Sequence, residues 1–329
     1  MTAGVRRVLV HTSVFPRWNG DRTPPFVFNQ CKLLAEQGWD ITVIAPHSAG
    51  AKFREEIEGM RVIRFPYFWP FKFEQLCYDG GILIQLQRRA VLKYMLPCFF
   101  LSQTLALLWC CLRFRPAILH SHSLLPQGLN AVWLGKFLRI PHITTSHGND
   151  VFGLSPDGWM GRMKRFVLRS ANAITVNSLA TKQAVLELGG AESKIHFIPA
   201  VANVGQVDST IVHTIQEKYG MGPKVLFVGR FIEEKGVLDL LQAFAQMKKQ
   251  LADAQCIFVG DGVLATEMKT IALDLKVEQA VHFVGWRPGK EIASWMAAAD
   301  VLVVPSKPVG TWQKLKVWLW SKPWPSVHL

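Results

Sequence analysis

Short, nearly continuous apolar runs alternate with amphipathic stretches along most of this chain. Runs of that kind predict strands buried on both faces, as in a parallel sheet covered by helices. The alternation therefore predicts an α/β protein with doubly wound parallel sheets. In the first block, strands are expected at residues 5–11, 40–45, 61–66, 117–121, 142–146, 173–177 and 195–199, and helices at 25–37, 127–138, 160–170 and 179–188.

The pattern is interrupted once and then resumes. Residues 201–222 lose the periodicity, apart from a short helical stretch at 211–219, and this indicates a linker. We therefore expect an N-terminal domain at 1–200, a C-terminal domain at 223–313 and an aberrant tail at 314–329. Strands of the second block are expected at residues 224–228, 255–259, 280–284 and 300–304, with helices between them.

One apolar segment competes with a two-domain soluble architecture. Residues 94–112 contain no charge and are flanked by Arg88, Arg89 and Lys93 on one side and by Arg113 and Arg115 on the other. The segment is long enough to cross a bilayer. A span here would, however, place strands of one sheet on opposite sides of the membrane. We favour a helix partly buried in the first domain and partly lying on a membrane surface, with a true span as the alternative.

The net charge calls for an anionic partner. The chain carries +13, and through Asp150 it has 17 Lys and Arg against 9 Asp and Glu. No stacking motif or helix-turn-helix signature supports nucleic acid, so an anionic membrane surface is the better candidate. The six cysteines show no C-x-x-C spacing, and from the strand-like run at residues 5–11 we expect no signal peptide. We expect a cytoplasmic protein with reduced cysteines, in peripheral contact with the inner face of the cytoplasmic membrane.

The stretch KVLFVGRFIEEKGV, residues 224–237, has the pattern of an anion site. A predicted strand ends at Gly229, which allows a tight turn, and Gly236 opens a helix predicted at 237–251. Free N–H groups at a helix N-terminus attract phosphate, and Arg230 and Lys235 add two positive charges. Two cations can hold a diphosphate without a metal. Since the chain has no D-x-D motif, we expect neither a metal nor another cofactor.

Polar residues also follow strands of the first block. Gly20 lies in a W-N-G-D turn after the first strand. His120 and His122 stand two apart at the end of another, where we expect the side chains to point to opposite faces or to begin a turn. His147, Gly148 and Asp150 follow the strand at 142–146 in the sequence T-S-H-G-N-D.

Together these segments resemble the retaining GT-B glycosyltransferases of family 4, the group 1 type. The resemblance rests on G-R-x4-K-G at 229–236, T-x-H-G-x-D at 145–150, FVGDG at 258–262 and VHFVGWRPGKEI at 281–292. It implies two Rossmann-like domains that face each other across a cleft. It also implies transfer of a sugar from a nucleotide-sugar donor, with retention of configuration, to an acceptor on the first domain. The basic, apolar stretch at residues 61–115 suggests that this acceptor is a glycan or lipid-linked molecule near a membrane.

The resemblance assigns roles to individual residues. His122 would contact the reacting sugar, and Asp150 would accept hydrogen bonds from its hydroxyls. The remaining residues would bind the donor: Gly20, His147 and Gly148 in the first domain, and Gly229, Arg230, Lys235, Gly236 and Gly260 in the second, where the backbone of Val284, Gly285, Trp286 and Arg287 would meet the nucleotide base.

Two departures from the family pattern leave alternatives open. IPAVANVGQVD at 198–208 replaces I-P-N-G-V-D, and the E-x7-E motif expected after Ser306 is missing from the sequence. The tail from Lys314, KLKVWLWSKPWPSVHL, is hypothesised to be a shifted reading frame that leaves the second domain incomplete. The alternatives are a catalytically inactive relic that at most binds nucleotide and, with less support, a nucleotide-sugar 2-epimerase, whose acid/base carboxylates have no specific match here.

Overall fold

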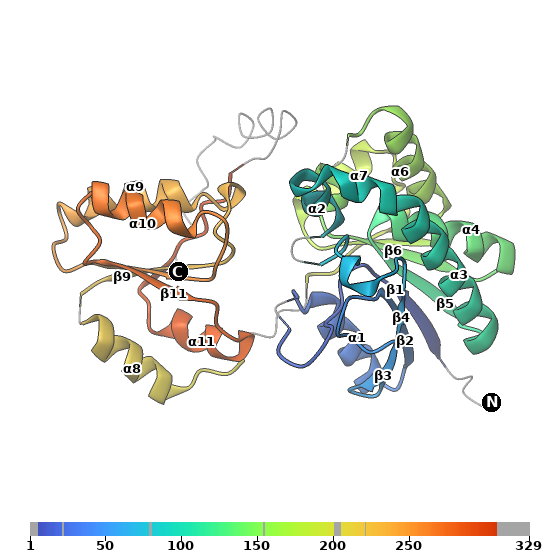
Figure 1. Cartoon of the computed structure of the whole chain (residues 1–329), viewed down its shortest axis with the longest axis horizontal. Helices are drawn as coiled ribbons and strands as arrows, with labels where there is room; N and C mark the ends of the chain where they lie inside the picture. The colour runs from blue at the N-terminus through green and yellow to red at the C-terminus, as the bar shows by residue number, and fades with distance from the viewer. Residues whose placement is uncertain are drawn as a thin grey trace. The chain divides into compact units, whose positions relative to one another are not determined.

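A computed structural model describes residues 6–21, 23–78, 81–153, 155–200, 205–220 and 222–307. The chain divides into two compact units, unit 1 up to residue 202 and unit 2 from residue 203. Each has its own sheet (Figure 1). The hypothesised tail at 314–329 lies outside the described residues.

Unit 1 is built on an eight-stranded sheet with the order β3-β4-β2-β1-β5-β6-β7-β8. All neighbouring strands are parallel except β3 and β4, which form an antiparallel pair at one edge. The parallel sheet predicted from the apolar runs is thus confirmed, and β3 was not predicted. The strands are β1 (Arg7–His11), β2 (Asp40–Pro46), β3 (Arg54–Ile57), β4 (Met60–Phe65), β5 (Ile118–His122), β6 (His142–Ser146), β7 (Ala173–Val176) and β8 (Ile195–Phe197).

Helices cover both faces of this sheet because successive strand residues point to opposite sides. In β1, Leu9 packs with the core beneath α3, whereas Val8 and Val10 pack with the core beneath α1. The helices of unit 1 are α1 (Phe26–Glu36), α2 (Ile82–Arg88), α3 (Leu96–Phe114), α4 (Leu129–Leu138), α5 (Asn149–Phe152), α6 (Gly158–Ser170) and α7 (Leu179–Glu187), with short helical turns at Phe71–Phe73, Ala90–Met95, Leu124–Gly128 and Glu192–Lys194.

The long apolar helix is part of the unit 1 core. By length and composition, the helical stretch 90–114 qualifies as a membrane span. In α3, however, Phe99, Gln103 and Leu107 are buried, and Phe99 and Leu107 pack with β1, β2 and β4. The helix is therefore a layer on the sheet, as favoured from the sequence over a true span.

Unit 2 has a four-stranded parallel sheet in the order β11-β10-β9-β12. Helices α9 and α10 cover one face, and α8 and α11 cover the other (Figure 1). Residues 209–219, within the stretch expected to be a linker, form α8, whose Ile215 and Tyr219 are buried in this unit. The elements are α8 (Ser209–Tyr219), β9 (Lys224–Val228), a helical turn at Glu233–Lys235, α9 (Val237–Lys248), β10 (Gln255–Val259), α10 (Ala265–Asp274), β11 (Val281–Gly285), α11 (Gly289–Ala297) and β12 (Val301–Leu302).

Candidate functional site

The carboxyl ends of three parallel strands in unit 2 meet in a cluster of glycine turns. The Gly229 N–H donates to the Val259 carbonyl at 3.0 Å, and the Gly260 N–H donates to the Gly285 carbonyl at 2.9 Å. The structure therefore brings together three segments that the sequence analysis singled out separately. Ligands of open parallel sheets bind at this edge.

Close backbone contacts require glycine at two positions near this edge of the sheet, Gly260 and Gly236. A Cβ on Gly260 would lie 1.9 Å from the Gly229 carbonyl oxygen. A Cβ on Gly236 would lie 1.9 Å from the Pro305 carbonyl oxygen, and Gly236 has a φ of +65° as the residue preceding α9. Any side chain at either position would push the strand ends apart.

Two cations flank the turn between β9 and α9. Arg230 is exposed and Lys235 is partly exposed. Gly229, which separates Arg230 from the end of β9, is also partly exposed. Among the residues that the structure describes, neither cationic group has a hydrogen bond or ion pair with another side chain. Asp239, in the first turn of α9, instead pairs with Lys307 at 2.8 Å. The local chemistry thus leaves two positive charges available to an anion near the N-terminus of α9.

The segment after β11 follows Gly285, the third glycine of this cluster. Gly285 has a φ of +81°, and a Cβ there would meet no atom within 4 Å, so its backbone conformation is what requires glycine at this position. Val284 is partly exposed, whereas Trp286 and Arg287 are exposed. Arg287 lines a groove of about 350 Å³ between α8 and α11, together with residues such as Thr214, Lys218 and Glu291.

In unit 1, histidines gather at the carboxyl ends of β5 and β6. The rings of His122 and His147 stack with centroids 5.2 Å apart, and the ring of His120 is tilted against that of His122 with centroids 4.4 Å apart. The expectation that His120 and His122 point to opposite faces or begin a turn is wrong. Both belong to β5, and alternate residues of a strand share a face.

His122 has one ring nitrogen engaged and one without a partner. Its Nδ1 lies 3.0 Å from His147 Nε2. Its Nε2 is buried and has no hydrogen-bond partner among the described residues. Burial, followed by the neighbouring His120, His147 and His11, lowers the pKa of His122 well below its usual value. The ring is therefore neutral at physiological pH, and its free nitrogen can donate or accept a hydrogen bond according to the tautomer.

Asp150 connects two loops of unit 1. Its Oδ2 accepts from the Leu124 N–H and its Oδ1 from the Ser146 hydroxyl, both at 2.9 Å. Asp150 is buried, and so is Lys164 nearby, whose pKa is lowered to about 8 by burial against the opposing effect of Asp150. The carboxylate thus ties the loop that follows β5 to the loop that follows β6. Gly148, with a φ of +96°, begins the second loop.

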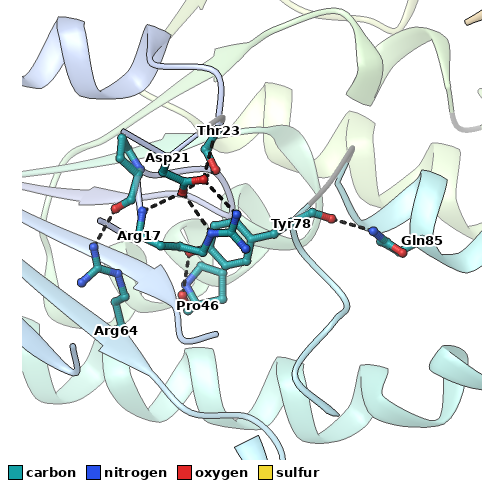
Figure 2. A network of polar contacts seen from close by, with 8 residues as sticks. Arg17, Asp21, Thr23, Pro46, Arg64, Tyr78 and Gln85 are labelled. Carbon is teal, nitrogen blue, oxygen red and sulfur yellow. Dashed lines mark hydrogen bonds and ion pairs between the residues drawn. The ribbon is translucent and has the colours of Figure 1, made fainter. Parts of the chain in front are cut away.

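The Gly20 loop is held by a network of polar contacts that the sequence did not reveal (Figure 2). The Asp21 carboxylate accepts from the Arg17 guanidinium at 2.8 and 3.0 Å and from the Thr23 hydroxyl at 2.8 Å. Burial opposes ionisation of Asp21, but these bonds lower its pKa to about 2. The i, i+4 spacing of Arg17 and Asp21 was the available signal. Gly20, exposed with a φ of +80°, completes the turn.

No group of His, Cys, Asp and Glu that could hold a metal ion is found in the described part of the chain. The predicted site residues fall into two sets, one in each unit. His122, His147, Gly148 and Asp150 lie close together in unit 1. Gly229, Gly260 and Gly285 do so in unit 2, beside Arg230, Lys235 and Gly236.

Solved structures with similar folds cover nearly all of the chain. Sucrose-phosphate synthase from Thermosynechococcus elongatus superimposes with a TM-score of 0.68 over 93% of this chain and 77% of its own, at 20% identity. HepE from Anabaena, solved in complex with UDP, gives a TM-score of 0.64 over 91% of this chain and 74% of its own, at 16% identity. At these identities the likeness concerns the fold, which is GT-B.

Sequence relatives are glycosyltransferases. TuaC of Bacillus subtilis (strain 168), named for teichuronic acid biosynthesis, is 25% identical over 91% of this chain and 75% of its own length. N-acetyl-alpha-D-glucosaminyl L-malate synthase of Bacillus anthracis is 24% identical over 58% of this chain. That match covers 50% of the synthase, so the chain spans about half of that relative.

Two family models match in succession and account for both units. "Glycosyltransferase Family 4" matches residues 25–204. "Glycosyl transferases group 1" matches residues 208–310. The chain belongs to glycosyltransferase family 4, the group 1 type of retaining glycosyltransferases with the GT-B fold.

Proposed function

We propose that this chain transfers a sugar from a nucleotide diphosphate donor to an acceptor, with retention of configuration. One observation supports this most: Arg230 and Lys235, with no partner among the described side chains, flank a turn of closely packed glycines at the N-terminus of α9. A diphosphate would accept hydrogen bonds from the Arg fork, the Lys ammonium and the first N–H groups of α9. These cations would neutralise the leaving group in place of a metal.

We assign the other residues of unit 2 to the rest of the nucleotide. Gly229, Gly236 and Gly260 allow the donor to approach the backbone at the strand ends. The backbone from Val284 to Arg287 would hydrogen-bond the base. HepE was solved with UDP and with UDP-glucose, and a uridine nucleotide is therefore the first donor class to test.

In unit 1 we assign His122 to the reacting sugar. Its unpartnered Nε2 would bond a sugar hydroxyl, and its neutral ring would make that contact without introducing charge. His147 holds the opposite nitrogen of His122, and Gly148 and Gly20 would admit donor or acceptor to the backbone. For Asp150 the contacts favour a positioning role, because both carboxylate oxygens already accept bonds from the two loops.

We further propose that the acceptor is a glycan or a lipid-linked precursor at the inner face of the cytoplasmic membrane. The basic charge of the chain and the exposed apolar side chains of α3 support an acceptor at that location. The surface concerned is described in the next subsection.

A transfer assay on the full chain tests the function. Purified protein is incubated with a panel of nucleotide sugars and lipid extract, and products are analysed by mass spectrometry and by NMR of the anomeric configuration. Transfer with retention supports the proposal. Nucleotide binding without transfer would indicate an inactive relic, and epimerised donor would indicate a 2-epimerase; either outcome would refute it.

A further inference from the structure

Helix α3 is apolar on two opposite faces. Phe99, Gln103 and Leu107 are buried against the sheet. On the other side, at spacings of four, four and three that share one helix face, four large apolar side chains are exposed. Soluble helices normally turn a polar face to water. The exposed fractions are 60% for Leu101, 56% for Leu105, 41% for Trp109 and 61% for Leu112.

The apolar surface continues onto the neighbouring helix α4. Trp133 is 52% exposed and Phe137, one turn later, is 80% exposed. The ring of Phe100 in α3 packs edge-on against Trp133, with centroids 6.2 Å apart, so the two helices form one surface. We call the exposed residues Leu101, Leu105, Trp109, Leu112, Trp133 and Phe137 the α3–α4 face. An exposed patch of this kind marks an interaction site.

The segment of the chain that carries the α3–α4 face has charges of one sign only. Residues 80–149 contain seven Lys or Arg and no Asp or Glu. Arg113 at the end of α3, and Lys136 and Arg139 on and after α4, are exposed beside the apolar side chains. Exposed apolar side chains with basic residues at their margin complement an anionic bilayer, which offers acyl chains beneath negatively charged headgroups.

A groove opens beside the same face. It has a volume of about 540 Å³ and is lined almost entirely by apolar side chains, among them Leu101, Phe100, Pro126 and Trp159. Leu101 thus belongs both to the exposed face and to the groove. Hydrocarbon could continue from the face into the molecule here.

We propose that the α3–α4 face docks unit 1 onto the surface of an anionic lipid bilayer. α3 would lie in the plane of the interface, with Leu101, Leu105 and Phe137 among the acyl chains and the tryptophans at headgroup depth. The basic residues at the margin would contact anionic headgroups. Because the opposite face of α3 belongs to the protein core, the helix docks on the membrane and does not cross it.

Vesicle flotation of the full chain tests this proposal. Wild-type protein should float with vesicles of phosphatidylcholine and phosphatidylglycerol, and less with phosphatidylcholine alone. The double variant Leu105→Glu/Phe137→Glu should lose at least about tenfold in partition coefficient, since it removes two inserting side chains. Leu179→Glu, 72% exposed on α7 of the same unit, is the matched control and should bind like wild type.

A second variant tests the basic residues at the margin of the α3–α4 face. Arg113→Gln/Arg139→Gln should weaken binding to anionic vesicles about fivefold per charge removed and leave neutral vesicles unaffected. Circular dichroism and urea unfolding report folding of each variant, and the single changes Leu105→Ser and Phe137→Ser replace the double variant if it fails to fold.

Two results would overturn the proposal. One is wild-type protein that ignores anionic vesicles, or variants that bind them like wild type. The other is a lipid-independent dimer abolished by Leu105→Glu/Phe137→Glu, which would make the face a contact between two copies. Vesicle binding requires neither donor nor transfer, so its failure is distinguishable from failure of the proposed function.

Discussion

At the scale of single residues, the histidine group of unit 1 is defined by burial. His120 is buried beside His122 on one face of the sheet, whereas His11 and His142 are buried on the other face, where Ser121 contacts His142. Burial lowers the pKa of His11 and His120 to about 4 and that of His142 to about 3. Imidazoles kept neutral in this way act as hydrogen-bonding groups. A role for His122 as a cationic general acid would require a pKa near the working pH.

We expect His122→Ala to lower kcat far more than it lowers donor affinity. The proposed contact with the sugar strengthens as charge develops, and loss of one such contact typically costs about 100-fold in turnover. Steady-state kinetics together with calorimetric donor binding separate the two quantities. His196→Ala, exposed in the same unit, is the control. Normal turnover of His122→Ala would leave this residue with a structural role only.

The same histidines predict acid sensitivity of unit 1. Their folded pKa values lie below the ordinary 6.5, so the unfolded chain binds more protons between about pH 6.5 and pH 4. Stability is therefore complete above pH 6.5 and falls as the pH drops through this window, by about 1.4 kcal/mol per pH unit for each histidine that protonates only on unfolding. Urea denaturation at pH 7 and pH 5 measures this. Equal stability at the two values would contradict the burial argument.

At the scale of elements, both groups of candidate residues are positioned by turns at the carboxyl ends of parallel strands. In unit 2 the turns after β9 and β10 touch through backbone atoms, which leaves no room for a side chain at Gly260. In unit 1 the turns after β5 and β6 are joined by a buried carboxylate. Each arrangement holds one loop against its neighbour.

We expect Gly260→Ala to destabilise the protein more than Gly220→Ala. Both glycines have positive φ, which costs a side chain about 1–3 kcal/mol, but a Cβ at Gly220 meets no atom within 4 Å. At Gly260 the collision with Gly229 adds to that strain. Urea denaturation and UDP affinity should both be worse for Gly260→Ala. Equal losses for the two variants would show that the strand ends separate easily.

Asp150→Ala should destabilise unit 1 by about 2–3 kcal/mol, because it leaves the buried Leu124 N–H without an acceptor and removes a charged hydrogen bond. Asp157→Ala, at an exposed position just before α6, should change stability little. Thermal or urea unfolding compares the two. If Asp150→Ala keeps its stability and loses only activity, Asp150 contacts substrate directly and the positioning role is wrong.

At the scale of the whole molecule, the sequence predicts what depends on local pattern. The continuous apolar runs of β1, β2 and β9 locate their strands because both faces are buried. β3, with the sequence R-E-E-I, was missed because it is a polar edge strand. None of its residues is fully buried, so its sequence shows no apolar run. The turn from Arg230 to Lys235 could also be predicted from the sequence, because its residues are neighbours along the chain.

Contacts between distant segments could not be predicted. The bond from Leu124 to Asp150 joins residues 26 apart, and no spacing rule identifies it. The α3–α4 face likewise needs both helices in place. The sequence showed an apolar segment in α3, whereas the structure divides its apolar side chains between the core and the surface.

The central claim is that unit 2 binds the diphosphate of a nucleotide sugar through Arg230 and Lys235. Calorimetric titration of the full chain with UDP, with and without magnesium, tests it most directly. We predict that Arg230→Ala and Lys235→Ala each weaken binding by about 1.5–3 kcal/mol, that Lys269→Ala on α10 does not, and that magnesium has little effect. UDP affinity unchanged in both Arg230→Ala and Lys235→Ala, or dependent on magnesium, would contradict the account.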